Sequence, residues 1–424
     1  MFKTLRNAWA IPELRKKLIF TILIMLLYRI GNVIPVPYIN VTALGVYFDT
    51  VLSDTILGLY NAMSGSAFST ATILALSIQP YINASIIIQL LTIAIPALER
   101  MSKEGGEEGK KKLNTITRIT TVGLGLLMGW AYYMMLKNNT GIITDQSTLA
   151  AIVIILSFTA GSTAVMWLGE QITEHGIGNG ISMILFANIV SRLPSLTGSV
   201  IGMITPTTWW HAVVVVIGVA ALIVLIVFVN DAERRIPVQY AKRVVGRKVY
   251  GGQNTNLPIK VSMTGVMPII FAQSIVSLPA TICAFGGWTN GWAYRNLFDS
   301  KSWAYAAFYF LLIFFFGWFY ATIQYDPVEI ANNMKKNGGF VPGFRPGKPT
   351  ADFVKKVINK IVIFGSVYLS IVALLPIIAG NLITGVDQLA IGGTSVIIVV
   401  SVALETVQAL EAQMLMRHYK GFLD

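Results

Sequence analysis

Long apolar stretches recur along this chain of 424 residues and limit what it can fold into. A hydrocarbon core about 30 Å thick needs roughly 20 apolar helical residues to cross it, and ten segments approach or exceed that length. They are residues 18–37, 71–96, 116–136, 148–169, 178–191, 210–230, 263–286, 303–324, 357–380 and 388–410. Only 12% of the residues are charged, about half the share in soluble domains. The sequence therefore predicts a polytopic membrane protein of the all-α class with ten transmembrane helices.

The distribution of Lys and Arg predicts how these helices are oriented. With both termini in the cytosol, most of the 32 basic residues fall in cytosolic segments, as the positive-inside bias requires. The inverted orientation would place nearly all of them outside. No cleavable signal peptide is expected, because the N-terminal basic residues run directly into a stretch long enough to span.

Two irregular spans occupy matching places in the chain. Pro80 in the second span and Pro268 in the seventh are each followed by polar residues at membrane depth, so both segments are candidates for broken helices. Aligning the two prolines also matches Ile82 with Ile270. One proline lies in the second span of the first five, and the other in the second span of the last five.

The fifth and tenth spans extend this repeat, because each begins with glycines, at residues 178–180 and 392–393. Five spans are an odd number, so two such halves face opposite ways. Interrupted segments at corresponding places in inverted halves indicate a path at the repeat interface. We therefore predict an N-terminal half at 1–200 and a C-terminal half at 201–424. Alternatively, the polar residues only join helices through hydrogen bonds.

The sequence contains no motif that indicates catalysis or cofactor binding. The nearest phosphate-binding candidate, Gly343 to Pro349, has three residues between its glycines in place of four, and Pro where Ser or Thr would hold magnesium. Cys283 is the single cysteine, and with three His residues it forms no zinc pattern. We expect no enzyme activity, no cofactor and no metal site.

Two functional classes remain, a passive pore and a secondary transporter with inverted repeats. Ion-coupled transport relies on ionisable residues within the spans, and the clear cases are Arg29, Glu170 and Glu405. An aliphatic wall suits a hydrophobic constriction, which blocks ions by excluding water. The sparse intramembrane charge therefore favours the pore.

Two long basic loops, residues 231–262 and 325–356, lie on the predicted cytosolic side. Their charge would allow contact with ribosomal RNA phosphates or with an acidic face of a protein motor. Charge needed only for topology is the alternative. Short turns would suffice for topology, and long ordered loops are usually functional, so the loop length favours a docking role.

Four strings of residues are distinctive: Pro80 to Gln89, Trp167 to Ser182, Tyr240 to Arg243 with Gly246 to Tyr250, and Gly339 to Gly347. Together they resemble the SecY family, whose members form the central subunit of the bacterial protein-conducting channel. The similarity covers essentially the whole chain, in order. It implies two five-span halves that close like a clamshell around an hourglass pore. It also implies passage of unfolded secretory polypeptides and sideways release of signal or transmembrane segments into the membrane.

The resemblance implies an aliphatic ring at the narrowest point of the pore. Matching positions are Ile78, Ile82, Ile181, Leu185, Met267, Ile270 and Ile398. Leu185 and Met267 replace the commoner Ile and should leave the ring apolar. Such side chains can move aside without breaking a hydrogen bond.

The same resemblance places a plug in the outer funnel, at residues 55–69. Its representative residues are Thr55, Tyr60, Met63, Gly65, Ser66 and Ser69. Ser66 stands where a second glycine is usual, so plug mobility is not simply carried over from the family. A lateral gate between the second and seventh spans maps to Asn83, Gln89, Gln273 and Ser274.

Partners and location also follow from the resemblance. It implies the small membrane subunits SecE and SecG, the SecA ATPase motor, the translating ribosome, signal peptides, unfolded preproteins and the lipid bilayer. Motor or ribosome docking maps to Arg243, Arg247, Lys248, Arg345 and Lys348. The implied location is the bacterial inner membrane, with both termini cytoplasmic.

Overall fold

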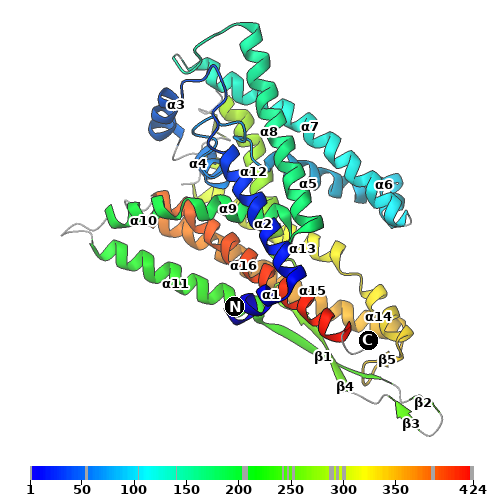
Figure 1. The fold of residues 1–424 in the computed structure, drawn as a ribbon. Helices are drawn as coiled ribbons and strands as arrows, with labels where there is room; N and C mark the ends of the chain where they lie inside the picture. The colour runs from blue at the N-terminus through cyan, green and yellow to red at the C-terminus, as the bar shows by residue number, and fades with distance from the viewer. Residues whose placement is uncertain are drawn as a thin grey trace.

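The structure is a computed structural model, and it is mostly helical (Figure 1). It describes residues 2–52, 56–103, 105–139, 141–202, 209–240, 243–245, 248–250, 254–285, 291–292, 296–297, 302–382 and 387–420. The first helices are α1 (Phe2–Ala10), α2 (Pro12–Gly31), α3 (Val41–Tyr47), the π-helix η1 (Phe48–Leu52), α4 (Ile56–Met63), α5 (Gln79–Ala94), α6 (Pro96–Lys103), α7 (Gly106–Asn138), α8 (Thr148–His175), α9 (Gly180–Ser191) and α10 (Leu193–Gly202). The later helices are α11 (Trp209–Asp231), α12 (Met267–Phe285), α13 (Trp303–Gln324), α14 (Pro327–Lys336), α15 (Lys348–Leu382) and α16 (Asp387–Lys420).

Six helices in the described part are long and apolar enough to cross a membrane, or seven if the bent pair α5 and α6 counts as one span. The six are Gly106–Asn138, Thr148–His175, Ala212–Asp231, Trp303–Lys336, Lys348–Ala379 and Ser395–Leu415. α5 and α6 meet at an angle of 106°. Two further apolar helices, Gly180–Ser195 and Met267–Ser277, are shorter. The chain is a multi-pass membrane protein, although these lengths do not establish ten spans.

Both prolines that the sequence marked as helix breaks lie in the first turn of a helix. Pro80 is the second residue of α5, and Pro268 is the second residue of α12. Pro is tolerated there because the N–H that it lacks would have no helical partner. The second span therefore begins at Gln79 and not at residue 71, which corrects the expected boundary. The turns before it include Ala71 and Ser77, whose φ angles are +44° and +50°.

The two long basic loops form strands, so the all-α expectation is wrong for this region. A three-stranded antiparallel sheet has the order β4-β1-β5, and a separate hairpin pairs β2 with β3. The strands are β1 (Glu233–Tyr240), β2 (Arg243–Val245), β3 (Lys248–Tyr250), β4 (Asn254–Lys260) and β5 (Gly339–Phe340). In β1, Ile236 and Val238 alternate with exposed residues and join a core with Val354 of α15. In a strand, buried and exposed residues alternate, so a search for runs of 20 apolar residues does not detect it.

The two ends of the chain lie at the end of the molecule that carries this sheet (Figure 1). The Thr4 hydroxyl donates a hydrogen bond to Glu411 Oε1 at 3.0 Å, and α1 packs against α16. The Lys260 ammonium, at the end of β4, also donates a hydrogen bond to the Gln408 side chain of α16. The termini and the basic loops therefore share one side of the molecule.

Candidate functional site

Apolar residues from α5 and the turn before it, and from α9, α12 and α16, belong to one buried cluster. Five members of the predicted ring belong to it, each with an exposed fraction of 1–2%: Ile78, Ile82, Leu185, Ile270 and Ile398. Ile181 and Met267 are partly buried and pack against this cluster. All seven predicted residues therefore belong to this cluster or pack against it, and their arrangement as a ring stays a prediction. None of these side chains carries a hydrogen-bonding amide or hydroxyl group, so the cluster has the composition of a constriction that excludes water.

The predicted plug forms the short helix α4 and the turns that follow it. Met63, at the end of α4, belongs to the buried cluster that contains the predicted ring residues, which we call the ring cluster. Tyr60 belongs to a second apolar cluster with Phe68 and Tyr132. The rings of Phe68 and Tyr132 stack with centroids 4.4 Å apart. Burial raises the pKa of the Tyr60 phenol, which stays protonated and donates to the Leu76 carbonyl oxygen at 3.0 Å. α4 therefore connects the two clusters.

Left-handed backbone follows the plug helix. Gly65 has a φ of +68° and Ser66 a φ of +71°, a conformation that costs a residue other than glycine about 1–2 kcal/mol. A Cβ atom at Gly65 would lie 2.8 Å from Arg29 Nη1, an atom with no hydrogen-bond partner in the described part of the chain. Ser69 lies in the turns beyond, and Thr55 lies outside the described residues.

A polar contact joins α5 to α12 at the predicted lateral gate. Gln79 Nε2 donates to Ser274 Oγ and to Ser277 Oγ, each at 3.4 Å. The three side chains have exposed fractions of 3%, 0% and 6%. The sequence did not single out Gln79. One signal was available, because Ser274 and Ser277 lie one helical turn apart and face the same way.

The other predicted gate residues make different contacts. Asn83 Nδ2 approaches Met128 Sδ of α7 at 4.0 Å, and Gln89 Nε2 donates to Ser85 Oγ of its own helix at 3.0 Å. Gln273 is buried, and its Oε1 has no hydrogen-bond partner among the described residues. Of the four predicted gate residues, Ser274 is the one whose described hydrogen bond links α12 to α5.

The predicted docking residues lie in the strand-forming loops. Arg243 and Lys248 belong to the β2–β3 hairpin, and Arg247 lies outside the described residues. Arg345 is exposed between β5 and α15, and Lys348 is exposed as the first residue of α15. The Arg345 carbonyl accepts a hydrogen bond at 2.8 Å from the hydroxyl of a threonine in α15. The salt bridges found among the described residues do not include its guanidinium, which leaves that group available to a partner.

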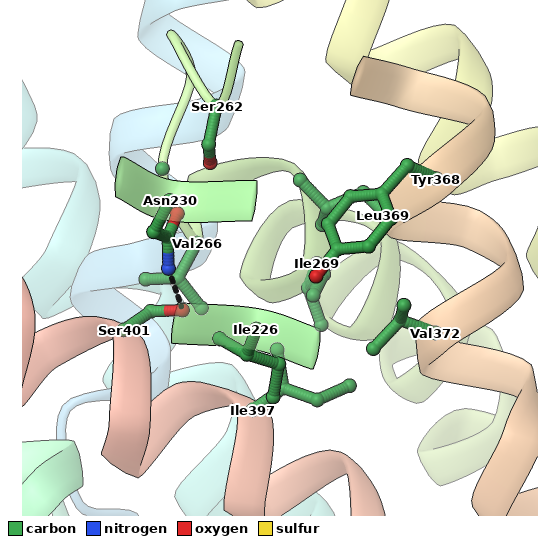
Figure 2. Close-up of a pocket in the computed structure, with 11 residues that line it drawn as sticks. Ile226, Asn230, Ser262, Val266, Ile269, Tyr368, Leu369, Val372, Ile397 and Ser401 are labelled. Carbon is green, nitrogen blue, oxygen red and sulfur yellow. Dashed lines mark hydrogen bonds between the residues drawn. The ribbon is translucent and has the colours of Figure 1, made fainter. Parts of the chain in front are cut away.

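A small cavity lies between α11, α12, α15 and α16 (Figure 2). Its polar side chains are those of Asn230, Ser262, Tyr368 and Ser401, and the rest of the lining is apolar. Asn230 Nδ2 donates to Ser401 Oγ at 3.4 Å, as Figure 2 shows. The lining includes no carboxylate, histidine or lysine, and the described residues contain no group of three or more potential metal ligands. The cavity therefore belongs to the packing of these helices.

The described apolar helices and the buried cluster that they share define a multi-pass helical membrane protein. The SecY family model matches residues 72–407. The chain belongs to the SecY family, so the resemblance seen in the sequence is confirmed.

Relatives match over nearly their whole length. Protein translocase subunit SecY of Streptomyces scabiei is 43% identical over 437 residues, which cover 100% of both chains. The subunit of the same name from Thermotoga maritima is 41% identical over 432 residues, covering 100% of this chain and 98% of that one.

Solved structures share the fold. One described as "The structure of a protein conducting channel" has a TM-score of 0.67 at 19% identity and covers 94% of this chain and 92% of that chain. "Sec61 in the Canine ribosome-channel complex from the endoplasmic reticulum" has a TM-score of 0.63 at 18% identity, with the same coverage. At these identities the likeness establishes the fold alone.

Proposed function

We propose that the chain is the pore-forming subunit of a protein translocase. It passes unfolded secretory polypeptides across the membrane and releases signal or transmembrane segments sideways into it. The observation that carries this proposal is the buried apolar cluster to which four helices from distant parts of the chain contribute. Aliphatic side chains offer no charge or hydrogen bond that would select one sequence, and they exclude water when they close on one another. The names of the relatives, translocase subunits, support the same role.

The proposed architecture has ten spans in two inverted halves, 1–200 and 201–424, around an hourglass pore. The six helices that pass the length test, the bent pair α5 and α6, α2 and the shorter α9 and α12 supply ten segments. A short helix is acceptable at membrane depth where protein or a water-filled path covers its ends. The positions of Pro80 and Pro268 at matching helix starts also support the repeat.

The proposed location is the bacterial inner membrane, with both termini in the cytoplasm. The hydrogen bond between Thr4 and Glu411 brings the ends of the chain together. The strand-forming loops, which carry much of the basic charge, lie at the same end. The positive-inside bias then places that end in the cytosol.

The seam between α5 and α12 is the proposed lateral exit. A signal core of about 7 to 15 apolar residues gains about 0.8 kcal/mol for each methylene removed from water. The contact between Gln79 and the two serines of α12 consists of two long hydrogen bonds, which together contribute about 1–3 kcal/mol. The apolar gain of an entering signal segment therefore exceeds the cost of separating this contact.

The proposed partners are SecE and SecG in the membrane, SecA or the translating ribosome at the cytosolic loops, and signal peptides with their unfolded preproteins. The exposed Arg345 and Lys348 carry positive charge that suits an acidic or phosphate-bearing partner. The solved canine Sec61 belongs to a ribosome-channel complex, as its description states.

Secondary transport is not favoured. Glu170, one of few carboxylates within the spans, forms a salt bridge at 2.9 Å with Arg118 of the neighbouring helix α7. Glu170 Oε1 also accepts a hydrogen bond from Arg118 Nε at 3.0 Å. A carboxylate held in this way joins α7 to α8 and is not poised for ion coupling.

Reconstitution separates the two classes. The chain is inserted into vesicles with SecE and SecG, and SecA, ATP and an unfolded preprotein are added. We expect preprotein that becomes protected from added protease only when ATP is present. Uptake of a small solute down an ion gradient, without ATP and without protected preprotein, would support a transporter.

The docking role of Arg345 predicts a selective defect. Arg345→Glu should weaken motor binding and ATP-driven export roughly tenfold or more, because a hydrogen bond to a charged group contributes about 1.5–3 kcal/mol. Binding of labelled SecA to vesicles measures this directly. Lys137→Glu makes the same change of charge at the end of α7, away from the loops, and should leave binding unchanged. A similar loss in both variants would argue against a docking site.

A further inference from the structure

A cluster of buried polar side chains lies where α2, α9 and the turn before α5 meet. Tyr28 and Asn188 have exposed fractions of 0%, and Ser77 has 3%. Asn188 Nδ2 lies 2.8 Å from Tyr28 Oη and 3.3 Å from Ser77 Oγ, and the two oxygens are 3.2 Å apart. We call these three residues the anchor cluster. Buried polar groups need partners, and the members of this cluster provide partners for one another.

The anchor cluster also binds the plug. Asn188 Nδ2 donates to the carbonyl oxygen of Met63 at 2.7 Å. Met63 is the last residue of α4, so its carbonyl has no partner within the helix. Nearby, Asn32 Nδ2 donates to the next carbonyl, that of Ser64, at 3.4 Å. Two side-chain amides, one from α9 and one at the end of α2, therefore hold the C-terminal end of the plug helix.

This contact differs in kind from the apolar packing of the plug. α12 and α16 also pack against α4, but apolar contact is non-directional. A hydrogen bond is directional, and it weakens as its two heavy atoms move beyond about 3.2 Å. Displacing the plug removes the nearest acceptor of Asn188 Nδ2, the Met63 carbonyl oxygen at 2.7 Å. The bond is made only in the closed arrangement, so it shifts the equilibrium towards that arrangement.

We propose that Asn188 is the residue that holds the plug closed, through its bond to the Met63 carbonyl. The proposal rests on the proposed function, since it assigns a gating contact to that same pore. A segment that opens the channel must then supply the free energy of this bond. A net hydrogen bond corresponds to roughly a five- to tenfold change in the ratio of closed to open plug.

A purely structural role for Asn188 would tie α2 to α9, and two variants separate these roles. Nδ2 carries two hydrogens and faces three acceptors, so Tyr28→Phe removes the tyrosine bond and leaves a hydrogen for the Met63 carbonyl. Asn188→Leu removes both bonds at similar volume. Ser182→Ala is the matched control in α9, because its buried hydroxyl has no hydrogen-bond partner among the described residues.

The experiment measures how often the plug is displaced, with no translocating substrate present. Cys283 is the single cysteine, so Cys283→Ser with Met63→Cys leaves one thiol, at a position that is 4% exposed when the plug is closed. The labelling rate with a membrane-impermeant maleimide is measured in proteoliposomes. We expect Asn188→Leu to raise this rate about five- to tenfold, and Tyr28→Phe and Ser182→Ala to stay within about twofold of the parent.

Two results would overturn the proposal: no rise with Asn188→Leu, or an equal rise with Tyr28→Phe. If Asn188→Leu also lowers the melting temperature, Asn188→Ser decides, because it keeps a hydroxyl near Tyr28 but is too short to reach the Met63 carbonyl. No rise with that variant would also overturn the proposal. Failure of the proposed function is read separately, as absence of preprotein transport by the parent chain, since labelling needs no preprotein.

Discussion

Ile82→Asp is expected to raise the ion conductance of the resting channel at least about tenfold over that of the parent. A tenfold change in an equilibrium between closed and conducting states corresponds to about 1.4 kcal/mol. Ile82 is 2% exposed within the ring cluster. A carboxylate at residue 82 attracts water into a constriction that blocks ions by excluding water. Ile270→Gly should act in the same direction from α12 by leaving a gap in the ring. Conductance across planar bilayers measures both effects.

A matched control separates leakage from loss of folding. Ile88→Asp places the same charge on α5, at a residue that is 7% exposed and not a member of the ring cluster. Both variants incur the cost of a charge in the membrane, about 3 kcal/mol at a helix centre. The control should therefore destabilise the protein without raising the conductance. Equal conductance in the two variants would contradict the assignment of the ring.

Gly180→Ala is expected to prevent normal packing of α8 against α9. A Cβ atom at Gly180 would lie 1.8 Å from the Gly169 carbonyl oxygen and 2.7 Å from its carbon. Both are backbone atoms, so the two helices would have to separate. Overpacking of this kind costs about 3 kcal/mol or more. Because α9 carries Ile181 and Leu185 of the ring, the change also displaces the constriction.

The neighbouring glycine provides the control for this prediction. Gly178 has a φ of +76°, and the nearest atom to an added Cβ is Thr406 Oγ1 at 3.6 Å. Gly178→Ala therefore meets only the backbone cost of about 1–2 kcal/mol. The fraction of detergent-extracted protein that elutes as a single species, and its melting temperature, should fall much further for Gly180→Ala. A larger loss for Gly178→Ala would mean that the close approach of the helices is not the limiting contact.

Much of the candidate site could be predicted because its residues lie in distinctive local strings. Ile82, Leu185 and Ile270 were placed in one ring from the resemblance, and all three belong to one buried cluster in the structure. Their role in sealing a pore remains a prediction, which the conductance measurement tests. Pro80 and Pro268 were expected to break helices, but they begin them, because the sequence alone does not show which residue is the first of a helix.

Other parts of the site depend on partners that are far apart in the chain. Gln79 and Ser274 are separated by 195 residues, and Asn188 and Met63 by 125. Nothing near Asn188 in the sequence indicates that its amide binds a carbonyl of the plug. The sheet of the basic loops was missed for a related reason, since β1 pairs with strands from two separate segments.

Apolar length and charge distribution are properties of the linear chain. By itself, the sequence therefore determined that this protein crosses a membrane many times and which family it resembles. It also determined which loops between the spans carry the basic charge. Only the tertiary structure decided which buried polar groups pair, where the second span begins and how closely α8 approaches α9. Those outcomes depend on distances of about 3 Å between segments that local patterns do not connect, and the assembled helices alone set such distances.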